Sequence, residues 1–222
     1  MLVGKNISKS FGEVKVLQNI NVEFQLGNII SIFGGSGAGK STLLYILSTL
    51  EKPDSGKVEF NGNSLIELSG DNLSNFRNEK IGFVFQSHNL LNEFNVFENI
   101  CMPAYVSKNK SIGVEKRARQ LLSDLGIENK ENNMPNQLSG GEKQRVAIAR
   151  SLINSPDIVF ADEPTGNLDD NNSKKFIKLI QNLNEKYNQT FIVVSHNKEF
   201  KKISNNSFEL INGKIKSIWT EE

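Results

Sequence analysis

The sequence contains a single cysteine, Cys101, and few prolines, five in 222 residues. One thiol cannot form a disulfide within the chain, so the fold must be stable without that crosslink. We expect Cys101 to be a small, buried, apolar side chain. A chain of this length can bury a hydrophobic core without covalent staples, either as one large domain or as a domain with a subdomain.

Strong charge and long apolar runs are also missing. The formal net charge is +1, so no imbalance points to nucleic acid or to an anionic membrane surface. Apolar runs such as NIISIF are far shorter than the roughly 20 residues of a membrane-spanning helix. The first residues, MLVGKN, do not resemble a signal peptide, and no lipidation motif is visible. We therefore expect a cytoplasmic protein that does not cross a bilayer.

Several short segments have the pattern of strands. Residues 1–24 alternate apolar and polar side chains, which is typical of antiparallel strands. Asn-Gly pairs at 61–62 and 212–213 predict hairpin turns. Further runs are apolar at consecutive positions, as in parallel strands that are covered on both faces. These runs are residues 28–33, 81–85, 157–162 and 190–196.

Other segments have helical spacing. Residues 41–50 and 173–187 predict helices with an apolar face, and residues 87–155 contain only helical patterns and loops. We predict a single α/β domain over residues 1–222. Its mainly parallel core sheet is flanked by helices and carries an N-terminal antiparallel β-subdomain, formed by about 1–86 and 156–222. A helical subdomain at about 87–155 is inserted into this core.

The segment GGSGAGKS at 34–41 matches the phosphate-loop pattern G-x-x-x-x-G-K-[ST] and lies between a predicted strand and a predicted helix. Glycines allow backbone N–H groups to wrap a phosphate chain at a helix N-terminus. Lys40 adds positive charge for the β- and γ-phosphates, and the Ser41 hydroxyl can bind Mg²⁺. This motif alone is compatible with GTPases, nucleotide kinases, helicases and transport ATPases. The predicted nucleotide contacts are Gly34, Gly35, Ser36, Gly37, Ala38, Gly39, Lys40, Ser41 and Thr42.

A second anion site is predicted in LSGGEKQRVAIAR at 138–150. Ser139, Gly140 and Gly141 open an amphipathic helix whose free N–H groups and dipole favour an anion. This run resembles the signature motif of the ABC-type ATPases. The other motifs of that family follow in the expected order along nearly the whole chain, so the protein is identified as similar to phosphate-loop NTPases of the ABC type.

The resemblance implies roles for individual residues. In IVFADE, Asp162 would hold Mg²⁺ through water and Glu163 would polarise the attacking water. Gln86 would link the γ-phosphate and Mg²⁺ to the helical subdomain, and His196 is in the place of the switch histidine. The implied catalytic residues are Glu163, His196, Gln86 and Lys40, and the implied metal ligands are Ser41, Gln86 and Asp162.

Two more positions follow from the resemblance. Asp169, in GNLD, would lie near the seam of a dimer. Phe11 would stack on adenine, although an aromatic residue in a strand-rich region can equally belong to the core. In the family, the signature motif of one copy closes on the ATP of a second copy. We therefore expect ATP and Mg²⁺ as ligands and a homodimer when ATP is bound.

The chain shows no long coiled-coil insertion, zinc-binding cysteines or second ATPase unit, so a soluble nucleic-acid-linked ATPase is a distant alternative. The segments EPTGNLD and HNLLNEFNVFENICMP resemble the group that contains the LolD, FtsE and MacB ATPases. They are closest to the lipoprotein-releasing type, although Ser87 and Asn95 depart from its pattern. A cell-division ATPase and a peptide or drug exporter ATPase are the alternatives. The resemblance implies separate integral-membrane subunits and a peripheral position on the cytoplasmic face of the inner membrane.

The stretch after Gln86 contains more apolar residues than a loop needs. Val96, Phe97 and Ile100 have helical spacing and are predicted to be core. Leu90, Leu91 and Phe94 precede that helix, and we expect them to form an exposed apolar surface that grips a membrane subunit.

Overall fold

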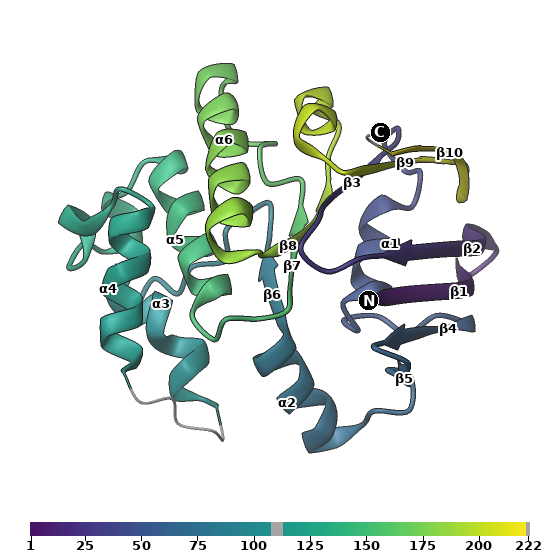
Figure 1. Ribbon diagram of the computed structural model, residues 1–222, viewed down its shortest axis with the longest axis horizontal. Helices are drawn as coiled ribbons and strands as arrows, with labels where there is room; N and C mark the ends of the chain where they lie inside the picture. Colours follow the sequence, from purple (N-terminus) through teal and green to yellow (C-terminus); the bar gives the residue numbers. More distant parts are fainter. Residues whose placement is uncertain (108–112, 221–222) are drawn as a thin grey trace.

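The computed structural model describes residues 1–107 and 113–220, which form two sheets surrounded by helices (Figure 1). Within these ranges the strand order is β2-β1-β4-β5 in one sheet and β10-β9-β3-β8-β7-β6 in the other. The first sheet contains β1 (Leu2–Phe11), β2 (Val14–Phe24), β4 (Ser55–Phe60) and β5 (Asn63–Ser64). The second contains β3 (Ile29–Phe33), β6 (Ile81–Val84), β7 (Ile158–Asp162), β8 (Thr190–Val194), β9 (Asn206–Ile211) and β10 (Lys214–Thr220).

The first sheet is antiparallel, whereas β6, β7, β8, β3 and β9 run parallel to one another in the second sheet. β9 and β10 form an antiparallel hairpin. The α-helices are α1 (Lys40–Leu47), α2 (Gly70–Lys80), α3 (Val96–Tyr105), α4 (Val114–Asp124), α5 (Gly140–Leu152) and α6 (Asp170–Tyr187). The 3₁₀ helices are η1 (Glu128–Lys130), η2 (Pro135–Gln137) and η3 (Lys198–Ile203).

The parallel sheet is buried on both faces. In β3, Ile29 and Phe33 join one core cluster, while Ile30 and Ile32 join the other. The first cluster includes side chains of α3, α4, α5 and α6, and the second includes α1 and the antiparallel sheet. Because successive side chains of a strand point to opposite faces, a strand between two apolar layers is apolar at nearly every position. This explains the mostly apolar runs in the sequence. The exception in β3 is the buried Ser31, whose hydroxyl bonds the Ser207 hydroxyl at 2.8 Å.

The helices α3, α4 and α5 pack against one another at one end of the molecule, and the antiparallel sheet lies at the other end (Figure 1). Local sequence fixes where these helices begin. Asn95 caps α3 by accepting a hydrogen bond from the Glu98 N–H, and the Glu98 carboxylate accepts one from the Asn95 N–H at 2.8 Å. Such a capping box satisfies N–H groups that the helix itself leaves unpaired.

The predicted strands, both hairpins and the parallel sheet are confirmed, and Cys101 is buried as expected. Three helices differ from the prediction. α1 ends at Leu47, three residues before the predicted end. α2 was not predicted, because none of its residues is fully buried and only a few are apolar. α6 begins at Asp170, three residues before the predicted start, because the Asp169 side chain caps it. Within the described ranges, no helix has the length and apolarity needed to cross a bilayer.

Candidate functional site

The phosphate loop connects β3 to α1. Gly39 precedes the first helical residue with φ +98°, and a Cβ at this position would lie 2.8 Å from the Val16 carbonyl oxygen, so only glycine fits. No side chain caps α1, a helix that lies wholly in the described part of the chain. A Cβ on Gly35 or Gly37 would meet no other atom within 4 Å. The uncapped N–H groups of the first turn therefore lie beside open space, which suits a phosphate group.

Asp162 ends β7 and is 7% exposed. Its two oxygens have different partners on α1. The Ser41 hydroxyl donates to Oδ1 at 2.8 Å, and the Tyr45 hydroxyl donates to Oδ2 at 2.8 Å. The structure therefore brings together two of the three predicted metal ligands, Ser41 and Asp162. Oxygen donors of this kind are the ligands that Mg²⁺ prefers.

The donor set also indicates how a metal would be held. Among the described residues, no group of three or more His, Cys, Asp and Glu side chains could bind a metal ion. Ser41 and Asp162 fit Mg²⁺, which usually keeps several waters and binds through one or two protein oxygens plus the phosphates of its substrate.

Tyr45 is part of this site and was not predicted from the sequence. Burial, together with the hydrogen bond to Asp162, raises the pKa of Tyr45 to about 12. The hydroxyl therefore remains protonated and able to donate at neutral pH. A tyrosine four residues after Ser41 lies on the same helix face, which is the signal that could have identified it.

Glu163 directly follows β7 and lies between Lys40 and His196. Its Oε1 is 3.7 Å from the Lys40 Nζ, and its Oε2 is 2.8 Å from the His196 Nδ1. The backbone fixes this position, because the Glu163 N–H donates to the Val194 carbonyl at 2.9 Å. Lys40 also donates to the Gly35 carbonyl at 3.1 Å. Three of the four predicted catalytic residues thus meet at one point.

Gln86 contacts the residues that follow Glu163 in the chain. Its backbone carbonyl accepts a hydrogen bond from the Asn167 side chain at 3.0 Å. A Cβ on Gly166 would lie 2.9 Å from the Gln86 Nε2, so the glutamine side chain lies against that glycine. The Gly166 N–H in turn donates to the Glu163 carbonyl at 3.0 Å. Gln86 therefore contacts the segment that carries Glu163, and its predicted contact with a metal stays a prediction.

The signature residues lie at the start of α5. Ser139 is the N-cap, and its N–H donates to the Glu142 carboxylate at 2.8 Å. Asp169 is the N-cap of α6, where the backbone N–H of Asn172 holds the pKa of its carboxyl below the ordinary value. A cavity of about 390 Å³ is lined by both caps. Its lining also includes Gly140, Gly141, Asn167 and Lys175. The predicted signature residues and Asp169 therefore share one surface.

Phe11 is not a core residue. Its side chain is 53% exposed, and the Lys9 Nζ lies 5.2 Å from the centre of its ring. Packing therefore does not explain this aromatic side chain, and its stacking on adenine stays a prediction.

The apolar residues after Gln86 are not all exposed or buried as predicted. Leu91 is 41% exposed, as expected. Leu90 is half-buried, less exposed than expected, and packs against the core that α3 and α5 form. Phe94 is also half-buried. Val96 and Ile100 are fully buried as predicted, whereas Phe97 is only partly buried at the edge of that core.

Polar contacts fix the path of this loop. The buried Asn99 side chain donates to the carbonyls of Leu91 and Phe94 at 3.0 and 2.9 Å. From α5, the Arg150 guanidinium donates to the carbonyls of His88 and Asn89, both at 2.7 Å. The loop between β6 and α3 therefore has a defined shape that does not depend on its exposed side chains.

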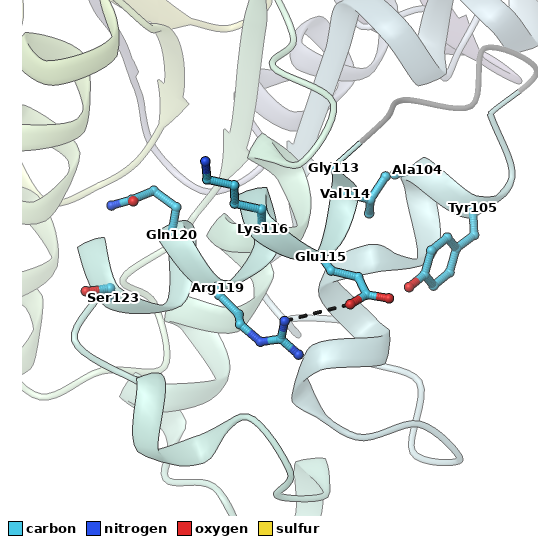
Figure 2. Close-up of a pocket in the computed structure, with 9 residues that line it drawn as sticks. All are labelled: Ala104, Tyr105, Gly113, Val114, Glu115, Lys116, Arg119, Gln120 and Ser123. Carbon is cyan, nitrogen blue, oxygen red and sulfur yellow. Dashed lines mark ion pairs between the residues drawn. The ribbon is translucent and has the colours of Figure 1, made fainter.

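Other cavities lie outside the nucleotide residues. One of about 540 Å³ lies beside this loop, with Phe83, Phe85, Asn89 and Arg150 in its lining. A larger one, of about 1040 Å³, lies at α4 and the end of α3 (Figure 2). Tyr105 borders it, and Glu115 and Arg119 form an ion pair of 3.7 Å on its wall (Figure 2). No predicted catalytic or nucleotide-binding residue lines either cavity.

Comparisons with known proteins show which family this chain is similar to. The family model described as ABC transporter matches residues 17–166. The lipoprotein-releasing system ATP-binding protein LolD of Cytophaga hutchinsonii is 47% identical, over 97% of this chain and 98% of that protein. LolD of Bacteroides thetaiotaomicron is 44% identical, over 97% of this chain and 99% of that protein.

Solved structures are similar over the same length. The dimeric structure of MJ0796, described as a bacterial ABC transporter cassette, has a TM-score of 0.91 and 37% identity. A dimeric post-hydrolysis state of MJ0796 with ADP and Pi has a TM-score of 0.90 and 36% identity. Both matches cover 99% of this chain and 98% of the other. With its phosphate loop, Asp162–Glu163 pair and signature helix in place, this chain belongs to the ABC transporter family.

Proposed function

We propose that this chain is the ATP-hydrolysing subunit of an ABC transporter that releases lipoproteins from a membrane. The observation that carries the ATPase part is the position of the Glu163 carboxylate, between Lys40 and His196 and next to the Ser41–Asp162 pair. The lipoprotein part is supported by the LolD relatives, which match almost the whole chain.

Phosphoryl transfer to water depends mainly on positioning and on neutralising charge. The N–H groups of the phosphate loop and the Lys40 ammonium bind the phosphates. Ser41 and Asp162 would hold Mg²⁺, with Gln86 as the third predicted ligand, and the metal would supply positive charge that neutralises the phosphates. Glu163 polarises the attacking water and accepts its proton. Phosphates offer Lys40 a stronger partner than the 3.7 Å contact with Glu163, which frees that carboxylate for water.

The proposed enzyme acts as a homodimer. Ser139, Gly140 and Gly141 line a cavity with Asp169, away from the phosphate loop of their own chain. Two copies arranged head to tail would place this surface on the nucleotide of the partner, and the similarity to the dimeric MJ0796 cassette supports that arrangement. Phe11, which is exposed and not part of the core, is proposed to stack on the adenine ring.

The membrane subunits are proposed to bind the loop between β6 and α3. Leu91 is exposed and Phe94 is half-buried there, next to the cavity lined by Phe85 and Arg150. The chain would then lie on the cytoplasmic face of the inner membrane. In this arrangement residues 87–155 act as a helical subdomain. The loop begins directly after Gln86, the residue proposed to contact the γ-phosphate, so ATP-driven closure would be transmitted through the loop to the membrane subunits.

The ATPase assignment is tested with Glu163→Gln. This change keeps the shape of the side chain but removes the proton acceptor, so hydrolysis should fall by about a thousandfold while ATP binding and dimer formation persist. Glu67→Gln, at an exposed glutamate, is the matched control and should keep the parent rate. Hydrolysis at the parent rate by the Glu163→Gln chain would contradict the assigned role.

The transport assignment needs the membrane subunits. The proteins that co-purify with this chain should be reconstituted with it in lipid vesicles that carry a lipoprotein. ATP should then release the lipoprotein from the vesicles, and the Glu163→Gln complex should retain it. A complex that hydrolyses ATP without releasing any lipoprotein would refute the transport assignment and leave the ATPase assignment intact.

A further inference from the structure

Tyr45 holds the same carboxylate that Ser41 contacts, but from the other oxygen. Ser41 and Tyr45 are four residues apart on α1, so their side chains lie on one face of the helix. The Ser41 hydroxyl donates to Asp162 Oδ1 and the Tyr45 hydroxyl to Oδ2, each at 2.8 Å. Asp162 is 7% exposed, so water contributes little to its orientation.

The Tyr45 ring is fixed by its neighbours. Its centre lies 5.8 Å from that of Phe83 on β6, at an interplanar angle of 46°. Phe83 in turn lies 6.3 Å from Phe160, which is on the same strand as Asp162. Tilted ring contacts of this kind favour a defined geometry. The hydroxyl therefore approaches Asp162 from a fixed direction.

The two hydrogen bonds have different tasks when a metal binds. Ser41 is itself a proposed Mg²⁺ ligand, and a hydroxyl that binds a metal through an oxygen lone pair keeps its proton, so it can still donate to Oδ1. Tyr45 bonds the opposite oxygen, so its bond leaves Oδ1 available to Ser41 and the metal. We propose that Tyr45 is a positioning residue for Mg²⁺, whose hydroxyl holds Oδ2 of Asp162 so that Oδ1 faces Ser41 and the metal. This inference rests on the proposed function, because it requires that ATP binds with Mg²⁺ at Ser41 and Asp162.

Residues that orient metal ligands typically contribute about 10- to 100-fold to metal affinity. The measured quantity is the metal enhancement of ATP binding, defined as the ratio of the ATP dissociation constants in EDTA and in Mg²⁺. Glu163→Gln serves as the parent chain, because ATP is not consumed during the titration. Adding Tyr45→Phe removes only the hydroxyl and keeps the ring against Phe83. We expect it to reduce the metal enhancement about tenfold and to leave ATP binding in EDTA unchanged.

Tyr105→Phe in the same parent chain is the matched control, since Tyr105 is 54% exposed and lines the cavity at α3 and α4. It should keep the full metal enhancement. An equal metal enhancement with and without the Tyr45 hydroxyl would overturn the inference. An equal loss of ATP affinity in Mg²⁺ and in EDTA would overturn it too, because such a loss indicates general loosening of α1. A parent chain that binds no ATP would instead contradict the proposed function.

Discussion

Nδ1 of His196 lies 2.8 Å from Oε2 of Glu163, and the His196 backbone N–H donates to the same oxygen at 3.2 Å. The two residues follow adjacent parallel strands, β7 and β8, whose last residues Asp162 and Val194 are paired. Side chains that follow parallel strands meet at the carboxyl edge of the sheet. The Glu163 side chain is 15% exposed and the histidine side chain 69%, so His196 covers Glu163 from the solvent side.

The first prediction concerns this contact. His196→Ala should lower kcat for ATP hydrolysis by about 10- to 100-fold, because Glu163 loses the side chain that orients it. ATP binding should not change, since His196 contacts the carboxylate and not the phosphate loop. Steady-state kinetics and equilibrium ATP binding separate these two effects. A variant with weaker ATP binding and normal kcat would show that the histidine acts on the nucleotide instead.

The second prediction concerns the signature surface. Ser139→Arg should prevent ATP-dependent dimer formation, because it places bulk and charge where the partner nucleotide would lie. The dimer can be measured by size-exclusion chromatography of Glu163→Gln chains with ATP. Ser123→Arg, at an exposed serine of α4, adds the same side chain elsewhere and should leave the dimer intact. Dimer formation and ATPase activity that survive Ser139→Arg would count against the sandwich of two chains.

The third prediction concerns the loop between β6 and α3. Replacing Leu91 and Phe94 by serine should abolish stimulation of the ATPase by the membrane subunits while basal hydrolysis stays largely unchanged. The backbone should keep its shape, because Asn99 bonds the main chain and not these side chains. Leu26→Ser, at another leucine of similar exposure, 37%, is the control. Loss of thermal stability in the double variant would show that these residues belong to the core.

The fourth prediction concerns the contact between α4 and α6. Asp124 accepts hydrogen bonds from Lys186 at 2.6 Å, from Gln120 at 2.9 Å and from Tyr187. Burial alone would raise the pKa of Asp124, but these hydrogen bonds outweigh it and hold the pKa below the ordinary 3.8. The folded state therefore binds its proton less readily than the unfolded chain, so this carboxylate stabilises the fold above pH 3.8.

Asp124→Asn should lower the free energy of unfolding by about 1–2 kcal/mol at pH 7. The difference from the parent should stay constant down to about pH 5 and shrink as the pH falls through the pKa of the folded state. Urea denaturation at pH 7, 5 and 3 measures it, because only the last value lies below the ordinary pKa of 3.8. Glu13→Gln, at an exposed carboxylate, should cost little at any of these pH values. A difference independent of pH would show that packing, and not charge, holds α4 against α6.

Much of this fold is readable from local patterns. Continuous apolar runs predicted the parallel strands because both faces of that sheet are covered, and the Asn-Gly pairs predicted the two hairpins. α2 was missed because it lies on the surface and none of its residues is fully buried, so its helical periodicity is weak. The start of α6 was misplaced because it depends on the Asp169 cap and not on the apolar face.

The sequence by itself determined the phosphate loop, the Asp162–Glu163 pair and the signature helix, because each of these depends on residue types at fixed local spacing. Only the tertiary structure decided which distant residues complete the site. Tyr45 meets Asp162 across 117 positions, and Leu90 turns into the core while Leu91 faces out. Such contacts are set by the packing of α1 and α3 against the sheet, and no local pattern in the chain encodes the distance between two elements that meet only after folding.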